Sequence, residues 1–467
     1  MDDDDPEMGT RFSRLKNRCL AVMIKCQEGG LKSFTWRLGT CIPASLLGYN
    51  GYLPSKQKSL EALTLFTDGG CWNCFYDLGR FPNLKAFSWT GLREAEDFES
   101  LRGCFQVTSH QLERIELDFL TWQHVCEANP LANDEDVNYF SREILRLSSD
   151  GLTLVFPAIK YLALSGLSFT SAERQMASAF NFNSLRSLKL RFCPGWEMFL
   201  KQVASLSQPI QLKSLEIQSN TQYNDEDDEA ATISEFLDTI EGLEDLYICT
   251  SSPSDALVIW RTMVRHKSTL KKFVHHQRSV SFETEYPNDL PDLSFVPDNL
   301  PLLNDRSQNP FSSLDLECLG MCCRPKYLIL HIRESGSDLK HLRSRWIERP
   351  KNGIHDSELS NDENNAEFSR INGCPEITRA FHKFAQWAFG ARGFPSLQVL
   401  AYGDFSYNGR YKKSNALFCR DVGLPTPSER NYRRLTKADK PLWDMLHQHT
   451  DILQACPTDL LLEEASL

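Results

Sequence analysis

The stretch Leu185-Arg-Ser-Leu-Lys-Leu190 decides the fold, because its pattern returns along the whole chain. It reads apolar, two variable residues, apolar, one variable residue, apolar, and we call this pattern the phrase. It recurs 27 residues later as Leu212-Lys-Ser-Leu-Glu-Ile217, and again 31 residues after that. The phrases begin at Leu31, Leu60, Leu84, Leu112, Ile159, Leu185, Leu212, Leu243, Leu270, Pro325 and Leu397.

The spacing of the phrases is that of a repeat protein. Most starts lie 24 to 31 residues apart, and leucine-rich repeats run at about 20 to 29 residues. Three phrases share a Phe-Pro prefix, at Phe81, Phe156 and Phe394. The second half of the phrase alternates as a strand does when one face is buried, and a single strand cannot bury that face alone. Neighbouring units must therefore stack as a parallel sheet.

Helical periodicity fills the segments between phrases, as where Trp196, Phe199 and Val203 share one face. Strand alternating with helix predicts an α/β leucine-rich-repeat solenoid of about ten or eleven irregular repeats. It should have a curved parallel sheet of short strands and a helical convex layer. An ordinary α/β domain is the alternative, and it predicts longer strands and no common phrase.

Composition suggests three regions. Residues 1–10 form an acidic tail that we expect to be disordered, and residues 11–407 form the solenoid. Two polar stretches, near 279–312 and 346–372, are expected to be flexible insertions within it. Residues 408–467 are expected to cap the array, since an open solenoid end exposes core.

Charge and cysteine content restrict the class of protein. The formal net charge of the 467 residues is -11, which argues against nucleic acid and anionic membrane as partners. The N-terminus has no secretory signal, and no stretch is long and apolar enough to span a membrane. The 15 cysteines are scattered, which is typical of free thiols in a reducing compartment. We expect a cytoplasmic or nuclear protein.

Four segments resemble the leucine-rich-repeat half of fungal F-box proteins: LKSFTWRLGT at 31–40, IPASLL at 42–47, SLEALTL at 59–65 and FPSLQVLAYGDFSY at 394–407. The resemblance extends over roughly residues 12–460. It implies that the repeats hold a substrate while an N-terminal F-box docks on the adaptor of a cullin–RING ubiquitin ligase. No F-box-like block precedes Leu31, so either the F-box has been lost or it is encoded upstream.

Motifs for catalysis or cofactors are few. Cys71-Trp-Asn-Cys74 is a lone CxxC, whereas zinc sites need further ligands at suitable spacing. We interpret these thiols as incidental, with a metal or redox role as the alternative. His276, after His275, should be a surface side chain of a strand, with metal binding as its alternative. No nucleotide-binding or hydrolase motif is present, and we expect no cofactor, no metal and no enzymatic activity.

The concave strand face is the remaining candidate site, built from variable positions of the phrases. A curved sheet with mixed charge and tyrosine is where a solenoid commonly binds protein. We predict a protein-binding module of the ubiquitin-ligase substrate-recognition type, or alternatively an interaction scaffold with no ligase link. The predicted contact residues are Arg114, Glu116, Asp118, Tyr161, Lys189, Arg191, Glu216, Gln218, Asp245, Tyr247, Lys272 and His276.

Overall fold

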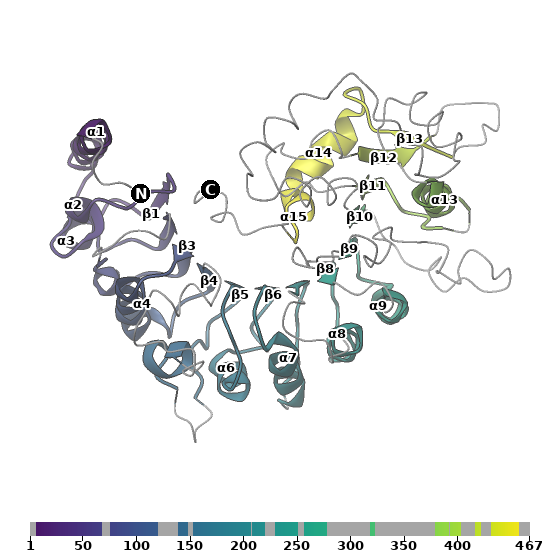
Figure 1. Ribbon diagram of the computed structural model, residues 1–467, viewed down its shortest axis with the longest axis horizontal. Helices are drawn as coiled ribbons and strands as arrows, with labels where there is room; N and C mark the ends of the chain where they lie inside the picture. Colours follow the sequence, from purple (N-terminus) through teal and green to yellow (C-terminus); the bar gives the residue numbers. More distant parts are fainter. Residues whose placement is uncertain are drawn as a thin grey trace, which may run out of the picture. The chain divides into compact units, whose positions relative to one another are not determined.

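The computed structural model divides the chain into two compact units, which meet in the sequence between Leu212 and Lys213. In each unit, short parallel strands alternate with helices that lie along one side of them (Figure 1). This confirms the predicted α/β class and the parallel sheet. The structure describes residues 6–67, 75–119, 139–147, 153–206, 208–219, 229–250, 256–277, 318–322, 379–391, 393–402, 416–421 and 431–456.

The first unit contains six strands that pair in parallel, each with the next in the chain. The strands are β1 (Ser33–Arg37), β2 (Ala62–Phe66), β3 (Ala86–Leu92), β4 (Arg114–Phe119), β5 (Tyr161–Ser165) and β6 (Ser187–Arg191). The helices of this unit are α1 (Pro6–Met23), α2 (Ala44–Leu47), α3 (Tyr52–Lys56), η1 (Leu78–Arg80), α4 (Ala95–Thr108), η2 (Phe140–Ile144), α6 (Glu173–Ala179) and α7 (Trp196–Ser205).

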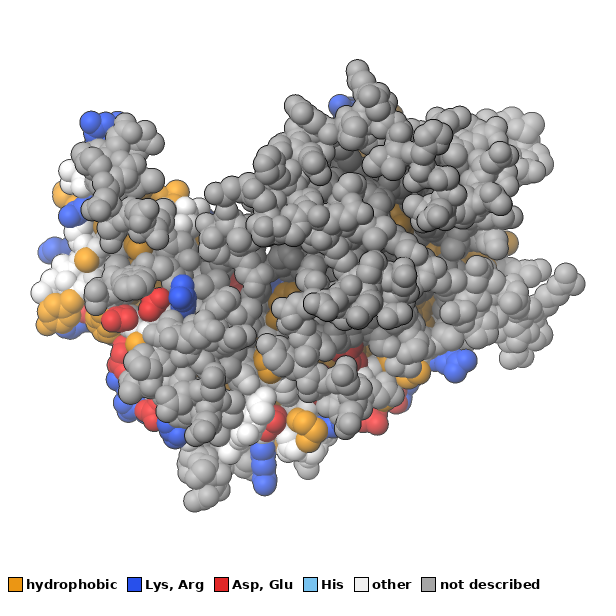
Figure 2. All heavy atoms as spheres, viewed as in Figure 1, with side chains coloured by type: hydrophobic (Ala, Val, Ile, Leu, Met, Phe, Trp, Pro, Cys, Tyr) orange, Lys and Arg blue, Asp and Glu red, His pale blue; other side chains and the backbone are white. Residues whose placement is uncertain are grey.

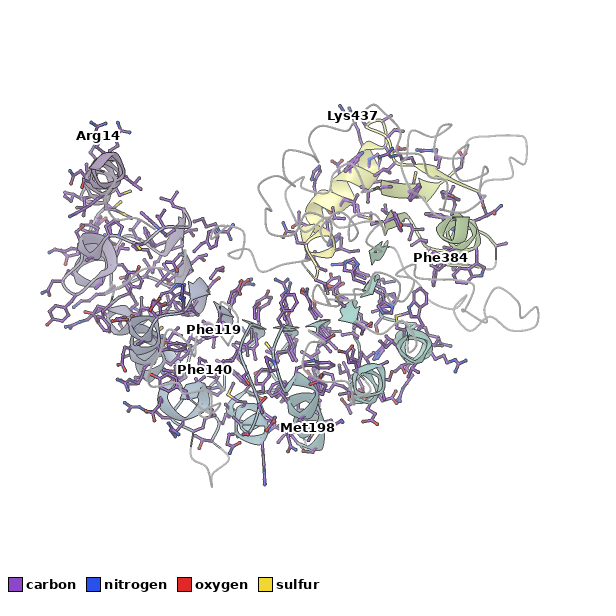
Figure 3. The ribbon with its side chains drawn as sticks, in the orientation of Figure 1. Arg14, Phe119, Phe140, Met198, Phe384 and Lys437 are labelled. Atoms are coloured by element: carbon purple, nitrogen blue, oxygen red, sulfur yellow. The ribbon has the colours of Figure 1, made fainter. Side chains whose placement is uncertain are left out.

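The apolar positions of the phrase build the core, as predicted. Leu185 and Leu188 are fully buried, and Leu190 is 1% exposed. The pairing aligns equivalent positions of successive phrases, so that Leu188 lies beside Leu162 on β5. Aromatic rings then fill the space between strands and helices, as Phe119 does by packing edge-to-face on Phe140, with 5.6 Å between ring centroids (Figure 3).

The backbone joins successive phrases at one further point, the residue after the first apolar position. The carbonyl of this residue accepts two N–H groups from the entry of the next strand. Lys85 O, for example, accepts from Glu113 N at 2.8 Å and from Arg114 N at 3.0 Å. The same pair of bonds recurs at Lys32, Glu113 and Lys160. Because the same pair of hydrogen bonds recurs, each strand begins in register with its neighbour.

The second unit continues the pattern and then changes it. Strands β7 to β11 pair in parallel, whereas β12 and β13 are antiparallel and extend the sheet beyond the last repeat. The strands are β7 (Ser214–Gln218), β8 (Asp245–Thr250), β9 (Lys272–Gln277), β10 (Cys318–Cys322), β11 (Val399–Tyr402), β12 (Ala416–Arg420) and β13 (Tyr432–Arg434). The helices are α8 (Glu229–Asp238), α9 (Ala256–Met263), η3 (Val264–His266), α13 (Arg379–Ala388), α14 (Lys440–Gln448) and α15 (Thr450–Leu453).

The strand between β9 and β11 is not the one that we expected there. We expected the phrase at Pro325 to form the strand before the last repeat, but β10 pairs with both β9 and β11 and takes that place. Its own phrase is Leu316-Glu-Cys-Leu-Gly-Met321, and Leu319 is in register with Phe273 and Leu400. This phrase has the same spacing of apolar residues and continues the parallel pairing. Pro325 lies outside the described residues.

Only parts of the expected regions lie within the described residues. Helix α1 begins at Pro6, within the segment 1–10. The expected insertions at 279–312 and 346–372 lie outside the described residues. Within 408–467, the antiparallel strands extend the sheet, while α14 and α15 pack on the face of the strands opposite α8 and α9 (Figure 1).

Candidate protein-binding faces

The twelve predicted contact residues occupy the third, fifth and seventh positions of their phrases. Side chains at these positions point away from the apolar anchors, because successive side chains of a strand alternate between faces. We call this side of the strands the inner face. It falls into two parts, one in each unit. The β4–β6 face carries Arg114, Glu116, Asp118, Tyr161, Lys189 and Arg191, and the β7–β9 face carries Glu216, Gln218, Asp245, Tyr247, Lys272 and His276.

Strand register brings the residues of the β4–β6 face into rows across the sheet. Arg114 is paired with Tyr161, Glu116 lies in the row of Lys189, and Asp118 lies in the row of Arg191. The first row is tightly built, since the Arg114 guanidinium lies 3.7 Å from the centroid of the Tyr161 ring. A cation over a tyrosine face is attracted by the ring quadrupole.

Arg114 also holds the neighbouring carboxylate. Its Nη2 donates to Glu116 Oε2 at 3.2 Å, and the two side chains are 46% and 37% exposed. Tyr161 is half-buried, and this burial raises the pKa of its hydroxyl above the ordinary value. The row therefore offers an ordered arginine, a carboxylate and an aromatic ring to the solvent side of the strands.

Asp118 has a perturbed carboxyl group on the β4–β6 face. Loss of hydration raises the pKa of its carboxyl to about 7; the positive charge of Arg191 opposes this rise and the carboxylate of Glu116 adds to it. The face presents mixed charge, three cations among two carboxyl groups, which suits charge-complementary recognition.

The β7–β9 face is covered by the end of the chain. Asp451, at the start of α15, places Oδ2 2.5 Å from the Tyr247 hydroxyl, which donates to it, and 3.1 Å from Lys272 Nζ. Lys272 also donates to Asp245 Oδ2 at 3.2 Å. Burial lowers the pKa of Lys272, but the Asp245 and Asp451 carboxylates outweigh it and raise the pKa above its ordinary value. The Lys272 side chain is therefore a protonated ammonium group held between the Asp245 and Asp451 carboxylates.

Glu216 anchors the residues that follow α15. The backbone N–H of Cys456 donates to Glu216 Oε1 at 2.9 Å, and Glu216 is fully buried. Gln218 and His276 are only 2% and 6% exposed. The structure thus brings Asp245, Tyr247 and Lys272 together around one carboxylate, and it places the predicted contact residues of β7–β9 beneath the chain's own C-terminal segment.

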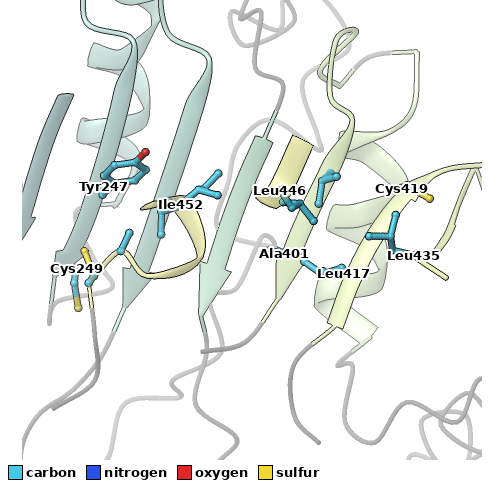
Figure 4. Packing of buried hydrophobic residues seen from close by; sticks show 12 residues of the cluster. Tyr247, Cys249, Ala401, Leu417, Cys419, Leu435, Leu446 and Ile452 are labelled. Atoms are coloured by element: carbon cyan, nitrogen blue, oxygen red, sulfur yellow. The ribbon is translucent and has the colours of Figure 1, made fainter. Parts of the chain in front are cut away.

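An apolar cluster joins this segment to the inner face of the second unit. Tyr247, Val274 and Cys249 pack with Ile452 and Ala455, and the cluster continues over the last strands (Figure 4). Its further members are Val399, Ala401, Leu417, Cys419, Leu435, Leu446 and Cys456.

Sequence reasoning missed the covering segment, although a signal was present. The fifth position of the phrase is polar or small in the first unit, as with Thr64, Ser88 and Lys189. It becomes Tyr247 and then Val274 in the second unit, and both are essentially inaccessible. Apolar residues on both sides of a strand indicate a sheet that is covered on both faces.

The expected metal and redox candidates lie partly outside the described residues. Five of the described cysteines, Cys19, Cys26, Cys104, Cys193 and Cys419, are free thiols. Among the described residues, no three histidine, cysteine or acidic side chains gather as a metal site would require. Cys71 and Cys74 lie outside the described residues. His276 lies on the inner face as expected but is buried.

The described surface of the first unit carries both signs of charge. On the side seen in Figure 2, acidic and basic side chains are intermixed over the described part of the first unit. None of the described helices is both long and apolar enough to cross a bilayer. No protein-family model matches the chain, and no curated protein matches it either.

Proposed function

We propose that this protein is a leucine-rich-repeat module that binds another protein through the β4–β6 face. The observation that carries the proposal is the contrast between the two inner faces. Glu116, at the fifth position of its phrase, keeps more than a third of its side chain exposed, whereas Glu216 and Tyr247, at the same position of β7 and β8, are fully buried.

The chemistry of the face supports a protein partner. Arginine and tyrosine are enriched where binding energy concentrates in interfaces. Arg114 is held in place by Glu116 and by the Tyr161 ring, so that little side-chain entropy is lost when a partner binds. The three cations, Arg114, Lys189 and Arg191, favour an acidic segment on that partner.

The repeat class rests on the phrase and on a detail of its register. In Leu185-Arg-Ser-Leu-Lys-Leu-Arg-Phe-Cys193, a cysteine stands eight residues after the first apolar position, where leucine-rich repeats carry asparagine or cysteine. The Cys193 thiol donates to Leu164 O of the preceding strand at 3.4 Å. A side chain that bonds the neighbouring turn at this position is a feature expected of such repeats.

The finer role follows from the resemblance to fungal F-box proteins. On this proposal, the partner on the β4–β6 face is a substrate that a cullin–RING ubiquitin ligase modifies, and the ligase adaptor binds a segment other than these strands. If no adaptor takes part, the same face serves a scaffold instead. Recovery of an adaptor with the tagged full-length chain separates the two roles.

The test is affinity purification with charge-reversed chains. Changing Arg114, Lys189 and Arg191 together to Glu should reduce recovery of the partner at least tenfold, because each close charge pair across an interface contributes on the order of 1 kcal/mol or more. The matched control changes three exposed cations of the same unit, Lys58, Arg174 and Lys201, to Glu. Equal recovery with the two triple variants contradicts the proposal.

A further inference from the structure

The segment from Thr450 to Cys456 contacts the β7–β9 face in a way that differs from the rest of the C-terminal region. We call this segment the tether end. It contains one turn of helix, α15 (Thr450–Leu453), followed by three residues to Cys456. A single turn has no stability of its own in water. Its position therefore depends on what it touches.

The contacts of the tether end are polar at both ends. Asp451 receives the Tyr247 hydroxyl and the Lys272 ammonium, and Cys456 gives its backbone N–H to Glu216. Ile452 and Ala455, 6% and 2% exposed, fill the apolar surface between these two points. The Asp451 carboxylate thus meets the Tyr247 hydroxyl and the Lys272 ammonium. Ile452 and Ala455 pack on the apolar surface beside them.

The preceding helix shares the apolar packing of the tether end, since both belong to one buried cluster. Leu446 of α14 is buried, and it shares a cluster with Val399 and Ala401 of β11 and Leu417 of β12. The tether end differs from α14 by the polar contacts that it adds to this packing. Burial disfavours the charges of Asp451 and Lys272, but the contacts outweigh it, because the pKa of Asp451 is lowered and that of Lys272 is raised. The arrangement therefore favours a carboxylate at this point.

The strands beneath the tether end have a second core that does not involve it. On their other side, Leu246 and Phe273 are fully buried, as are Ile233 of α8 and Trp260 of α9. Trp260 packs edge-to-face on Phe273, with ring centroids 5.2 Å apart. Release of the tether end leaves this core in place.

From these observations we propose that the β7–β9 face is a second docking face, for a short helical segment of a partner protein that carries an Asp followed by Ile. The tether end is the built-in occupant of this face and leaves it when the partner segment binds. Lys272 and Tyr247 select the carboxylate, Glu216 receives a backbone N–H, and Val274 and Cys249 form the apolar floor. This inference is independent of the function proposed for the β4–β6 face.

The first measurement asks whether the tether end is releasable, in the full chain with Asp451→Lys. Repulsion from Lys272 and loss of the charge-assisted bonds should raise amide exchange at residues 450–456 and alkylation of Cys456 by about ten- to a hundredfold. Asp451→Asn should have a smaller effect. Asp444→Lys, the same charge change at an exposed position of α14, is the matched control and should behave as the wild type. Exchange in α8 and α9 should stay slow.

The second measurement asks what the vacated face binds. The probe is a fluorescent peptide with the sequence of residues 446–457. It should bind the Asp451→Lys chain at least tenfold more tightly than the wild type, where the tethered copy competes at high effective concentration. The same peptide with Asp451→Asn should bind neither chain well.

Three results overturn the inference. One is a tether end that stays protected in Asp451→Lys. Another is loss of protection in α8 and α9 together with it, since the segment is then part of the core. The third is a released tether end with no peptide binding. Because none of these readouts involves Arg114, Lys189 or Arg191, they fail or succeed separately from the proposal for the β4–β6 face.

Discussion

His275 occupies the third apolar position of its phrase, where Leu190 and Ile248 stand in other repeats. It is buried in the core of the second unit, and Trp260 Nε1 donates to its Nδ1 at 2.9 Å. The proton of the neutral ring is therefore on Nε2, which lies 3.5 Å from Thr250 Oγ1. Burial lowers the pKa of His275 to about 4. The residue is thus a polar core side chain that must stay neutral.

This residue predicts a pH dependence of stability. The unfolded chain takes up the proton near pH 6.5 and the folded chain only near pH 4, so the free energy of unfolding falls as pH drops between these values, by roughly 3 kcal/mol. His275→Gln, which keeps an acceptor for Trp260, should flatten this dependence in urea unfolding at pH 7, 6 and 5. His110→Gln, at an exposed position, should leave it as in the wild type. An unchanged slope in His275→Gln contradicts the assignment.

At the scale of elements, the residues that directly precede the first five strands, β1 to β5, alternate in charge. Glu61, before β2, accepts from Lys32 Nζ at 2.8 Å and from Lys85 Nζ at 3.4 Å. These bonds, with Lys32 the stronger contributor, hold the pKa of Glu61 below its ordinary value. Lys160 repeats the pairing with Glu113 at 2.8 Å. Opposite charges at the starts of adjacent strands favour the observed order of pairing. Pairing a strand with the next but one would bring like charges, such as Lys32 and Lys85, together.

The alternation predicts a local effect of charge reversal. Glu61→Lys places three cations side by side, and amide exchange of Ala62 and Ala86, whose N–H groups bond to Lys32 O and Glu61 O, should accelerate a few-fold. Salt at about 1 M should largely remove the difference, since exposed charges are then screened. Adding Lys32→Glu restores a pair of opposite charges at the entries of β1 and β2 and should restore part of the protection at Ala62. If it does not, the side chains play no part in register.

At the scale of the whole molecule, we expect a destabilising substitution to affect only the repeats next to it. Repeats contact mainly their neighbours, so damage spreads along the array only as far as adjacent units. Leu188→Asp buries an unpaired carboxylate in the core of the first unit, at a cost of several kcal/mol. Hydrogen exchange should lose protection in β5 and β6, while β8 and β9 keep theirs. Simultaneous loss in all of these strands contradicts a repeat-by-repeat organisation.

The phrase was enough to predict the parallel sheet, because each apolar anchor must be buried and the alternation fixes which side it faces. Leu188 and Leu215 are fully buried as that logic requires. The same reasoning placed one strand at the phrase that begins at Pro325, whereas β10 (Cys318–Cys322) is the strand that pairs with β9 and β11.

The candidate site was predictable only in part. The position of a residue in its phrase predicts whether its side chain lies on the inner face. The pairing of equivalent positions also predicts that Arg114 lies beside Tyr161. The phrase does not predict whether the inner face is exposed to solvent or covered. The covering of Tyr247 and Glu216 depends on Asp451 and Cys456, more than 200 residues away in the chain.

Local periodicity in this protein therefore determined the strands, their buried side and the order in which they pair, because these follow from contacts between neighbouring repeats. Tertiary structure alone decided that Asp451 meets Lys272 and Tyr247. That contact depends on the path of a distant segment and on three polar groups converging at one point, which no repeat of the sequence encodes.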